Sequence, residues 1–296
     1  MKLQGIYVPL VTPFTVDNRI DYPVLEQLAE LMIQKGVAGI VAFGTTGEYY
    51  SFSAAERAEV LQRIAAVAQG RVQLIVGVND LSTAGSIEHA KTAKQYGYQA
   101  LMLSAPPYSL PSQAGIIHHF ETVAEAQDLP IIMYNYPDRI GVSLDFDTIN
   151  HLRQHPNIIA IKESSGDFNF ALQMLQAAWP DFEVMCGSDG LATDFFFWGS
   201  HSWISGAANV YPDEHVALAR AALAGDWNTA RAQMRHMYAG IRSMELGDYN
   251  QKAKLGIQRF GLEAGSVRMP LVDLDAKAKA EFLQLLTSAN DHADMA

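Results

Sequence analysis

Short apolar runs that recur about every 30 residues constrain the fold of this chain more than any other feature. Each run is followed by Gly, Pro, Ser, Thr or Asn, as expected for strands that are buried on both faces of a parallel sheet. The eight runs are GIYVPLVTP, GIVAFGTTG, VQLIVGVN, ALMLSAPP, PIIMYNYP, IIAIKESSG, EVMCGSDG and SWISGAAN. Because parallel neighbours need crossover helices, the pattern predicts a closed (β/α)8 TIM barrel of the α/β class, with a doubly wound open sheet as the alternative.

The segments between these runs have helical periodicity. Residues 24–35 and 54–68 each place their large apolar side chains on one side of a helix. Ser53 followed by Glu56 is the capping-box pattern at the start of the second segment. These features support the alternation of strand and helix that a barrel requires.

More helical sequence follows the eighth run than one closing helix can account for. The helical patterns after that run cover residues 211–223, 227–244, 251–260 and 276–286. No linker rich in Gly, Ser or Pro divides the chain. We therefore expect a catalytic barrel over residues 1–225 and a C-terminal helical extension over residues 226–296.

Composition and charge exclude several classes of protein. The net charge of -11 and the absence of a basic run argue against a nucleic-acid partner. No apolar stretch is long enough to span a membrane, and Pro9 and Pro13 interrupt the only possible signal core. The single Cys186 fits a reducing compartment, which predicts a cytoplasmic protein. The adjacent His118 and His119 diverge on a helix, so no metal site is expected.

Lys162 is the candidate nucleophile. It ends the run IIAIK, and in a barrel the chemistry lies at the carboxyl ends of the strands. A desolvated lysine has a lowered pKa and can attack a ketone to form an imine. The alternative is a solvated lysine at the strand mouth, paired with Glu163.

Two other segments contain polar groups at strand ends. The turn GTTGE presents Thr45, Thr46 and several backbone N–H groups that can cradle a carboxylate, although a plain turn has the same composition. Tyr134 ends the fifth run and can transfer protons, or it is an aromatic residue at the barrel mouth. Arg139, on the following loop, can pair with a carboxylate or be solvated.

With these segments in view, the chain resembles the dihydrodipicolinate synthase / N-acetylneuraminate lyase family of class I pyruvate-dependent lyases. The resemblance covers almost the whole chain, in the family order and spacing. Its motifs are GTTGE (44–48), PPY (106–108), PSQAG (111–115), YNYPDRIG (134–141), IKESSGD (161–167), GSD (187–189) and ISGAAN (204–209).

The resemblance implies catalytic roles for four residues. Lys162 resembles the lysine that forms the imine, and Tyr134 the tyrosine that shuttles protons. Thr46 resembles the hydroxyl that links Tyr134 into a proton relay. Tyr108 resembles the tyrosine that reaches the active site of the neighbouring subunit, which implies a homodimer or homotetramer.

The resemblance also implies substrate contacts. Thr45 and Thr46 resemble the cradle for the pyruvate carboxylate, with Gly187 and Ile204 lining the pocket. Arg139 stands where synthases bind the carboxylate of aspartate semialdehyde. The implied substrates are pyruvate or another 2-oxo acid and a second small molecule that bears a carboxylate. No cofactor is implied beyond the covalent lysine imine.

Several positions depart from the family pattern. Pro107 precedes Tyr108 where synthases commonly have two tyrosines. At the site of feedback inhibition by lysine, Ala54, Gly85 and Pro107 replace the usual histidine, glutamate and tyrosine, so we do not expect this inhibition. The segment GDYNQKAK lacks the proline-containing stretch of biosynthetic synthases.

Three functions therefore stay open. The first is a synthase that joins pyruvate to L-aspartate 4-semialdehyde. The second is a catabolic aldolase or dehydratase for a 2-keto-3-deoxy sugar acid, with the same lysine and tyrosine. The third is a protein that binds 2-oxo acids without turnover.

Overall fold

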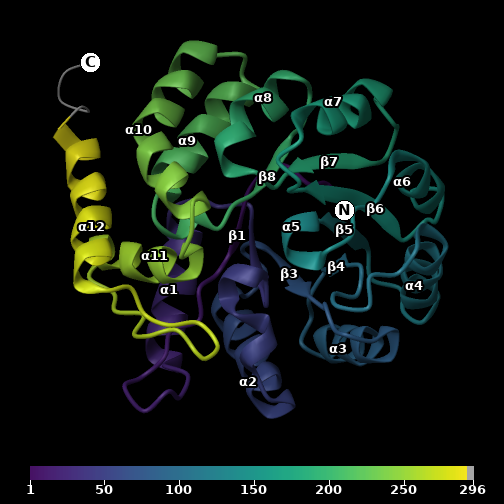
Figure 1. Cartoon of the computed structure of the whole chain (residues 1–296), viewed down its shortest axis with the longest axis horizontal. Coiled ribbons are helices and arrows are strands. Elements are labelled where there is room, and N and C mark those ends of the chain that lie inside the picture. Colours follow the sequence, from purple (N-terminus) through teal and green to yellow (C-terminus); the bar gives the residue numbers. More distant parts are fainter. Residues whose placement is uncertain (292–296) are drawn as a thin grey trace.

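The computed structural model describes residues 1–291, and in them eight parallel strands close into one barrel (Figure 1). Each strand pairs with the next along the chain, and β8 pairs with β1, with Ile6 opposite Trp203. The strands are β1 (Gly5–Pro9), β2 (Gly39–Ala42), β3 (Gln73–Gly77), β4 (Ala100–Ser104), β5 (Ile131–Asn135), β6 (Ile158–Glu163), β7 (Glu183–Cys186) and β8 (Ser202–Ile204). The predicted barrel is confirmed, and the open sheet is wrong.

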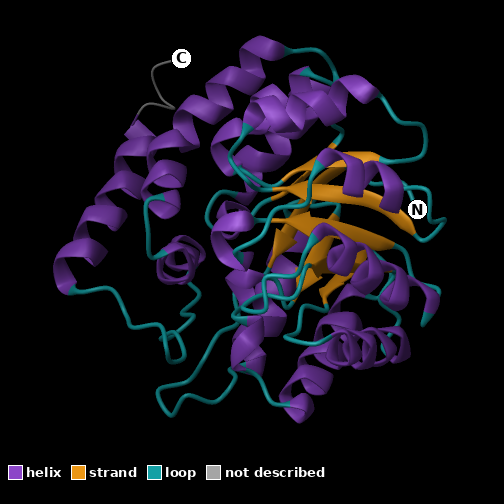
Figure 2. Cartoon of the chain, turned by 45° about the vertical axis from the view of Figure 1, so that its right-hand side comes forward, coloured by secondary structure: helices purple, strands orange, loops and turns teal. Residues whose placement is uncertain are grey.

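Helices surround the strands on all sides of the barrel (Figure 2). In the barrel region they are α1 (Tyr22–Gln34), α2 (Ala54–Ala68), α3 (Thr83–Gln95), α4 (Gln113–Glu125), α5 (Pro137–Ile140), α6 (Phe146–Leu152), α7 (Phe168–Ala177), α8 (Ala192–Phe197) and α9 (Pro212–Leu223). Helix α2 has the predicted bounds and capping box. Helix α1 begins two residues before the predicted start, because Asp21 caps it by accepting a hydrogen bond from the N–H of Val24.

Alternate residues of each strand face opposite layers. On β6, Ala160 belongs to the cluster inside the barrel, whereas Ile161 packs outward against the helices. On β5, Ile132 and Tyr134 face the interior in the same way, and Met133 faces the helices. Because strand side chains have a period of two, the residue after Ile161 on β6 returns to the interior at the carboxyl end of the strand.

Asn209 joins the end of the barrel to its beginning. Its side-chain oxygen accepts a hydrogen bond from the N–H of Val11 at 3.2 Å, and its amide nitrogen donates to the carbonyl of Pro9 at 2.9 Å. Asn209 is fully buried, so these bonds satisfy backbone groups that water does not reach.

The C-terminal extension lies along one side of the barrel (Figure 1). It contains α10 (Trp227–Glu245), α11 (Tyr249–Gly256), a 3-10 helix (Ile257–Phe260) and α12 (Ala276–Asp291). The last residues of the predicted extension, 292–296, lie outside the described part of the chain, and a division into two units at residue 225 stays a prediction. Within residues 1–291, no helix is long and apolar enough to cross a membrane.

Candidate active site

A cavity of about 460 Å³ opens at the carboxyl ends of the strands, where the predicted chemistry was expected. Of the eight candidate residues, seven line it: Thr45, Thr46, Tyr134, Arg139, Lys162, Gly187 and Ile204. They come from the segments after β2, β5 and β7 and from β5, β6 and β8 themselves. The structure thus brings together groups that are up to about 160 residues apart in the chain.

Lys162 projects from β6 into this cavity and is 7% exposed. Its Nζ lies 4.2 Å from the ring centroid of Tyr134, the residue paired with it on β5. Burial lowers the pKa of Lys162 to about 8, and the nearby Asp189 carboxylate partly opposes this shift. The buried ammonium therefore has a substantial neutral fraction at physiological pH, as a nucleophilic amine requires.

Glu163 does not pair with this lysine. The next residue along a strand faces the opposite side, and Glu163 accepts a hydrogen bond from Asn135 Nδ2 at 2.7 Å. Burial raises the pKa of the Glu163 carboxyl. The alternative interpretation of Lys162 as a solvated partner of Glu163 is therefore wrong.

Gly187 makes room for the lysine. A Cβ at this position would lie 2.8 Å from Lys162 Cγ and 2.0 Å from Ser164 Oγ. Any larger residue would displace one of these side chains. Ile204, which is 1% exposed, closes the cavity from β8.

Tyr134 is buried beside the lysine and interacts with the side chain of Thr45. Burial raises the pKa of Tyr134 to about 12, against the lowering effects of Thr45 and of the Arg139 charge. The phenol is therefore protonated at neutral pH and can donate a proton. The threonine that the structure places against Tyr134 is Thr45, and the relay role of Thr46 stays a prediction.

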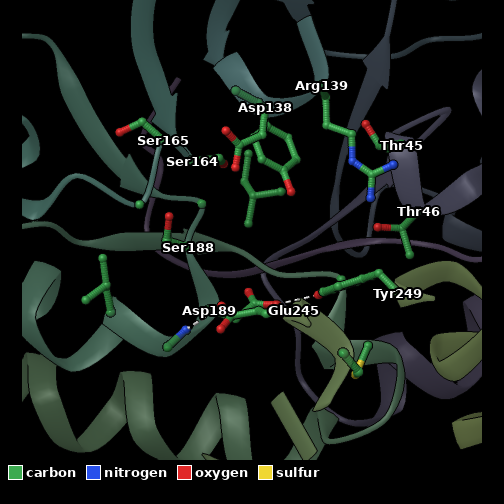
Figure 3. A pocket seen from close by; sticks show the side chains of 18 of the residues that line it. Thr45, Thr46, Asp138, Arg139, Ser164, Ser165, Ser188, Asp189, Glu245 and Tyr249 are labelled. Atoms are coloured by element: carbon green, nitrogen blue, oxygen red, sulfur yellow. Dashed lines mark hydrogen bonds between the residues drawn. The ribbon is translucent and has the colours of Figure 1, made fainter. Parts of the chain in front are cut away.

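Thr45 and Thr46 begin a short 3-10 helix, Thr45–Gly47. The first N–H groups of a helix have no intrahelical partner and favour an anion. Thr46 Oγ1 lies against Gly206, only 2.7 Å from where a Cβ of that glycine would stand. Arg139, on α5, points its guanidinium toward the same turn (Figure 3). This side of the cavity is suited to carboxylates.

Tyr108 is the one candidate residue outside the cavity. It is 93% exposed, and its backbone adopts a left-handed conformation with φ of 71°. A tyrosine in this conformation is strained and presents its ring to solvent. Its role in a neighbouring subunit stays a prediction.

Several lining residues were given no role in the sequence analysis. Asp189 is 4% exposed and accepts hydrogen bonds from Trp203 Nε1 at 3.0 Å and from the hydroxyl of Tyr249 (Figure 3). Glu245 and Asn250 also line the cavity and, like Tyr249, belong to the C-terminal extension. The position of Asp189 just after β7 is a signal for it, but no strand-end pattern identifies residues of the extension.

Among residues 1–291, no group of three or more His, Cys, Asp or Glu side chains is arranged to hold a metal ion. The predicted independence from metals and cofactors stays a prediction.

The rate of imine formation should follow the titration of Lys162. A pKa of about 8 leaves roughly a tenth of the amine neutral at pH 7, whereas the ordinary value of 10.5 leaves roughly one part in 3000. Because the neutral form reacts, we expect the rate of pyruvate adduct formation to rise about tenfold per pH unit at low pH and to level off above about pH 8. Stopped-flow trapping between pH 6 and 10 measures this rate. A rise that continues to pH 10 would contradict the lowered pKa.

A desolvated lysine beside a protonated tyrosine, at the carboxyl end of a closed barrel, defines a class I lyase that works through an imine. Comparison with known proteins identifies the family. Residues 2–289 match the model of the dihydrodipicolinate synthetase family. The chain belongs to that family.

Related sequences and structures agree over nearly their whole lengths. A 4-hydroxy-tetrahydrodipicolinate synthase from Exiguobacterium sp. is 37% identical and covers 97% of this chain and 98% of its own. The enzyme of that name from Methanosarcina mazei is 36% identical and covers 94% and 95%. The structure of the synthase from Methylacidiphilum fumariolicum is similar with a TM-score of 0.94 at 31% identity, covering 98% and 97%.

A further similar structure was solved with pyruvate bound. The dihydrodipicolinate synthase from Acinetobacter baumannii, complexed with pyruvate, has a TM-score of 0.94 and 32% identity to this chain, covering 98% of it and 99% of its own chain.

Proposed function

We propose that this chain condenses pyruvate with L-aspartate 4-semialdehyde, as a 4-hydroxy-tetrahydrodipicolinate synthase. The observation that carries the proposal is the desolvated Lys162 against Tyr134, with the threonine turn and the Arg139 guanidinium together on the side of the cavity that suits carboxylates (Figure 3). The names of the relatives support the same activity.

The first half of the reaction uses Lys162 and Tyr134. The neutral amine of Lys162 attacks C2 of pyruvate while the threonine turn holds the pyruvate carboxylate. Tyr134 donates a proton to the former ketone oxygen, which leaves as water and gives the iminium. The Tyr134 phenolate then accepts a proton from C3, which gives the enamine and restores the phenol. The covalent imine supplies the electron sink, so the chemistry needs no separate cofactor.

The second half uses Arg139. The enamine carbon attacks the aldehyde of the semialdehyde, whose carboxylate pairs with the guanidinium of Arg139. The amino group of the new adduct then attacks the imine carbon, closes the ring and releases Lys162. This step consumes no water. The overall reaction therefore releases one water molecule, the one that leaves when the imine forms.

We further propose that the protein works in the cytoplasm as a homodimer or homotetramer. Support comes from the exposed, strained Tyr108, whose family counterpart reaches a neighbouring active site. The single cysteine, Cys186, is buried, as suits a reducing compartment.

Replacing Arg139 tests the second substrate. Loss of a charge partner from a binding site costs about 2–5 kcal/mol, or roughly 30- to 5000-fold. We expect Arg139→Ala to lower kcat/KM for aspartate semialdehyde within this range and to leave pyruvate trapping on Lys162 nearly unchanged. Arg139→Lys should recover only part of the loss, because lysine lacks the planar fork.

The matched control is Arg242→Ala, which removes the arginine that α10 contributes to the same cavity. A larger effect at Arg242 would mean that the carboxylate binds at the other end of the cavity. Assays with a panel of 2-keto-3-deoxy acids run in parallel. Turnover of one of these acids without turnover of aspartate semialdehyde would replace the synthase by the catabolic alternative, and pyruvate binding without any turnover would leave a binding protein.

A further inference from the structure

A buried ion pair joins the threonine turn to the C-terminal extension. Glu48, the residue that ends the motif GTTGE, lies 2.6 Å from Lys254 of α11, measured between Oε1 and Nζ. Their side chains are 0% and 2% exposed. A buried charge pair of this kind is expensive to desolvate and contributes little net stability compared with apolar residues of similar volume. Stability alone therefore gives no reason for charges at this position.

Both partners are fixed by further contacts. The other carboxylate oxygen of Glu48 accepts a hydrogen bond from the backbone N–H of Arg268 at 2.8 Å. Lys254 Nζ donates to the carbonyl of Ser266 at 2.7 Å and lies 4.0 Å from the ring centroid of Phe14. The ion pair and its hydrogen bonds therefore hold the end of the threonine turn in a fixed position against the C-terminal extension, more than 200 residues away in the sequence.

The backbone of Glu48 is itself strained. Its φ of 60° and ψ of 40° are left-handed, a conformation that a residue with a side chain adopts only where its surroundings hold it. Its N–H donates to the carbonyl of Thr45 at 3.0 Å, so the conformation of Glu48 closes the turn that presents both threonines.

A second contact from the same helix reaches that turn. Asn250 Nδ2 donates to the carbonyl of Thr45 at 3.0 Å. Asn250 and Lys254 are four residues apart on α11 and so lie on one face of it. One helix face of the extension thus holds both ends of the 3-10 turn.

We propose that Lys254 is a positioning residue for the reaction: through its ion pair with Glu48 it holds the turn of Thr45 and Thr46 in the geometry that binds the pyruvate carboxylate. The C-terminal extension is then part of the substrate site without its lysine touching the substrate. The inference rests on the proposed role of the turn in binding pyruvate, but it does not depend on the identity of the second substrate.

The experiment uses the full chain and pyruvate alone. In Glu48→Gln the shape of the side chain is kept and the charge is removed. We expect the pyruvate concentration for half-maximal borohydride trapping on Lys162 to rise roughly 10- to 100-fold, the effect of weakening a hydrogen bond to a charged group. The maximal trapping rate at saturating pyruvate should stay within about twofold, because Lys162 and Tyr134 do not contact the pair.

The double variant Glu48→Gln with Lys254→Met separates positioning from folding. Lys254→Met alone leaves an unpaired buried carboxylate and is expected to lower the unfolding temperature. The double variant has neither charge of the pair, so it should recover most of the lost unfolding temperature. If the pair positions the turn, the double variant should still need a raised pyruvate concentration for half-maximal trapping, although its stability has recovered. Wild-type half-saturation in the folded double variant would overturn the proposal.

Lys252→Met is the matched control. Lys252 lies on the same helix but donates to the carbonyls of Ser243 and Gly247, away from the turn. An equal loss of pyruvate affinity in this variant would also overturn the proposal, because it would show a general effect of disturbing α11. Absence of any adduct in the wild-type protein would instead contradict the proposed function.

Discussion

Lys162→Met is expected to abolish the pyruvate adduct and to lower turnover by roughly 10³- to 10⁶-fold, the range found when a covalent nucleophile is removed. The physical reason is that, among the side chains of residues 1–291, only the Nζ of Lys162 combines burial, a pKa lowered to about 8 by that burial, and a place in the cavity beside Tyr134. Methionine keeps the length and apolar contacts of the side chain, so the barrel should remain folded.

Mass spectrometry after borohydride reduction with pyruvate locates the adduct. The wild-type protein should contain one reduced pyruvate on Lys162, and the variant none. Lys91→Met is the control, because this lysine is exposed on α3 and pairs with Glu88. Lys254 is the most informative competitor, since burial lowers its pKa to about 8 as well. An adduct on Lys254 or Lys91 in place of Lys162 would contradict the assignment of the nucleophile.

Tyr134→Phe is expected to lower turnover by about 10²- to 10⁴-fold, the usual contribution of a positioned acid or base. The ring would still pack against Lys162, but the protonated hydroxyl that can donate to the leaving oxygen would be absent. The overall fold and the unfolding temperature should change little, because the ring occupies the same space.

The rate of adduct formation and the rate of overall turnover should both be measured in this variant. If Tyr134 donates the proton that removes water, both rates fall. Thr45→Val is the companion variant, since Thr45 interacts with the Tyr134 hydroxyl, and a smaller loss of the same kind is expected. Wild-type rates in Tyr134→Phe would leave this tyrosine as an aromatic residue at the barrel mouth.

The barrel could be predicted because each strand is a local signal. Runs such as ALMLS and IIMYN are apolar up to their last residues, since they are covered on one side by helices and on the other by the barrel interior. The helix at 54–68 could be predicted to its ends because a capping box and a regular apolar period lie within the segment itself.

Of the candidate site, the residues at strand ends could be predicted from the sequence, and the residues that come from other elements could not. Lys162, Tyr134 and the threonine turn follow apolar runs directly, and the cavity contains all of them. Tyr249 and Asn250 could not be found this way, because they reach the cavity from a helix whose place is set by tertiary packing. Which of the two adjacent threonines contacts Tyr134 depends on how the short 3-10 turn is oriented. The sequence does not reveal this orientation, because Thr45 and Thr46 have the same chemistry.

Other polar residues near the strand ends have structural roles. Thr12 donates to the carbonyl of Gly47 at 2.9 Å, and Asn79 accepts from the N–H of Ser104 at 2.8 Å. Both are buried and satisfy backbone groups between neighbouring strand ends. A polar residue at a strand end can therefore either react with a substrate or hold the backbone of the site in place, and its position alone does not distinguish the two roles.

The bond between the Glu48 carboxylate and the Arg268 N–H spans 220 residues of sequence, which has a consequence for synthesis on the ribosome. At about 5–20 residues per second, the partners of this carboxylate emerge roughly 10–40 seconds after it does. During that time the early strands can pair with one another, but the carboxylate lacks Lys254, the partner with which it is buried in the folded chain, and so stays in water. The turn proposed to bind the pyruvate carboxylate is therefore among the last parts to be completed, and on that proposal a nascent chain that already contains Lys162 does not yet bind pyruvate.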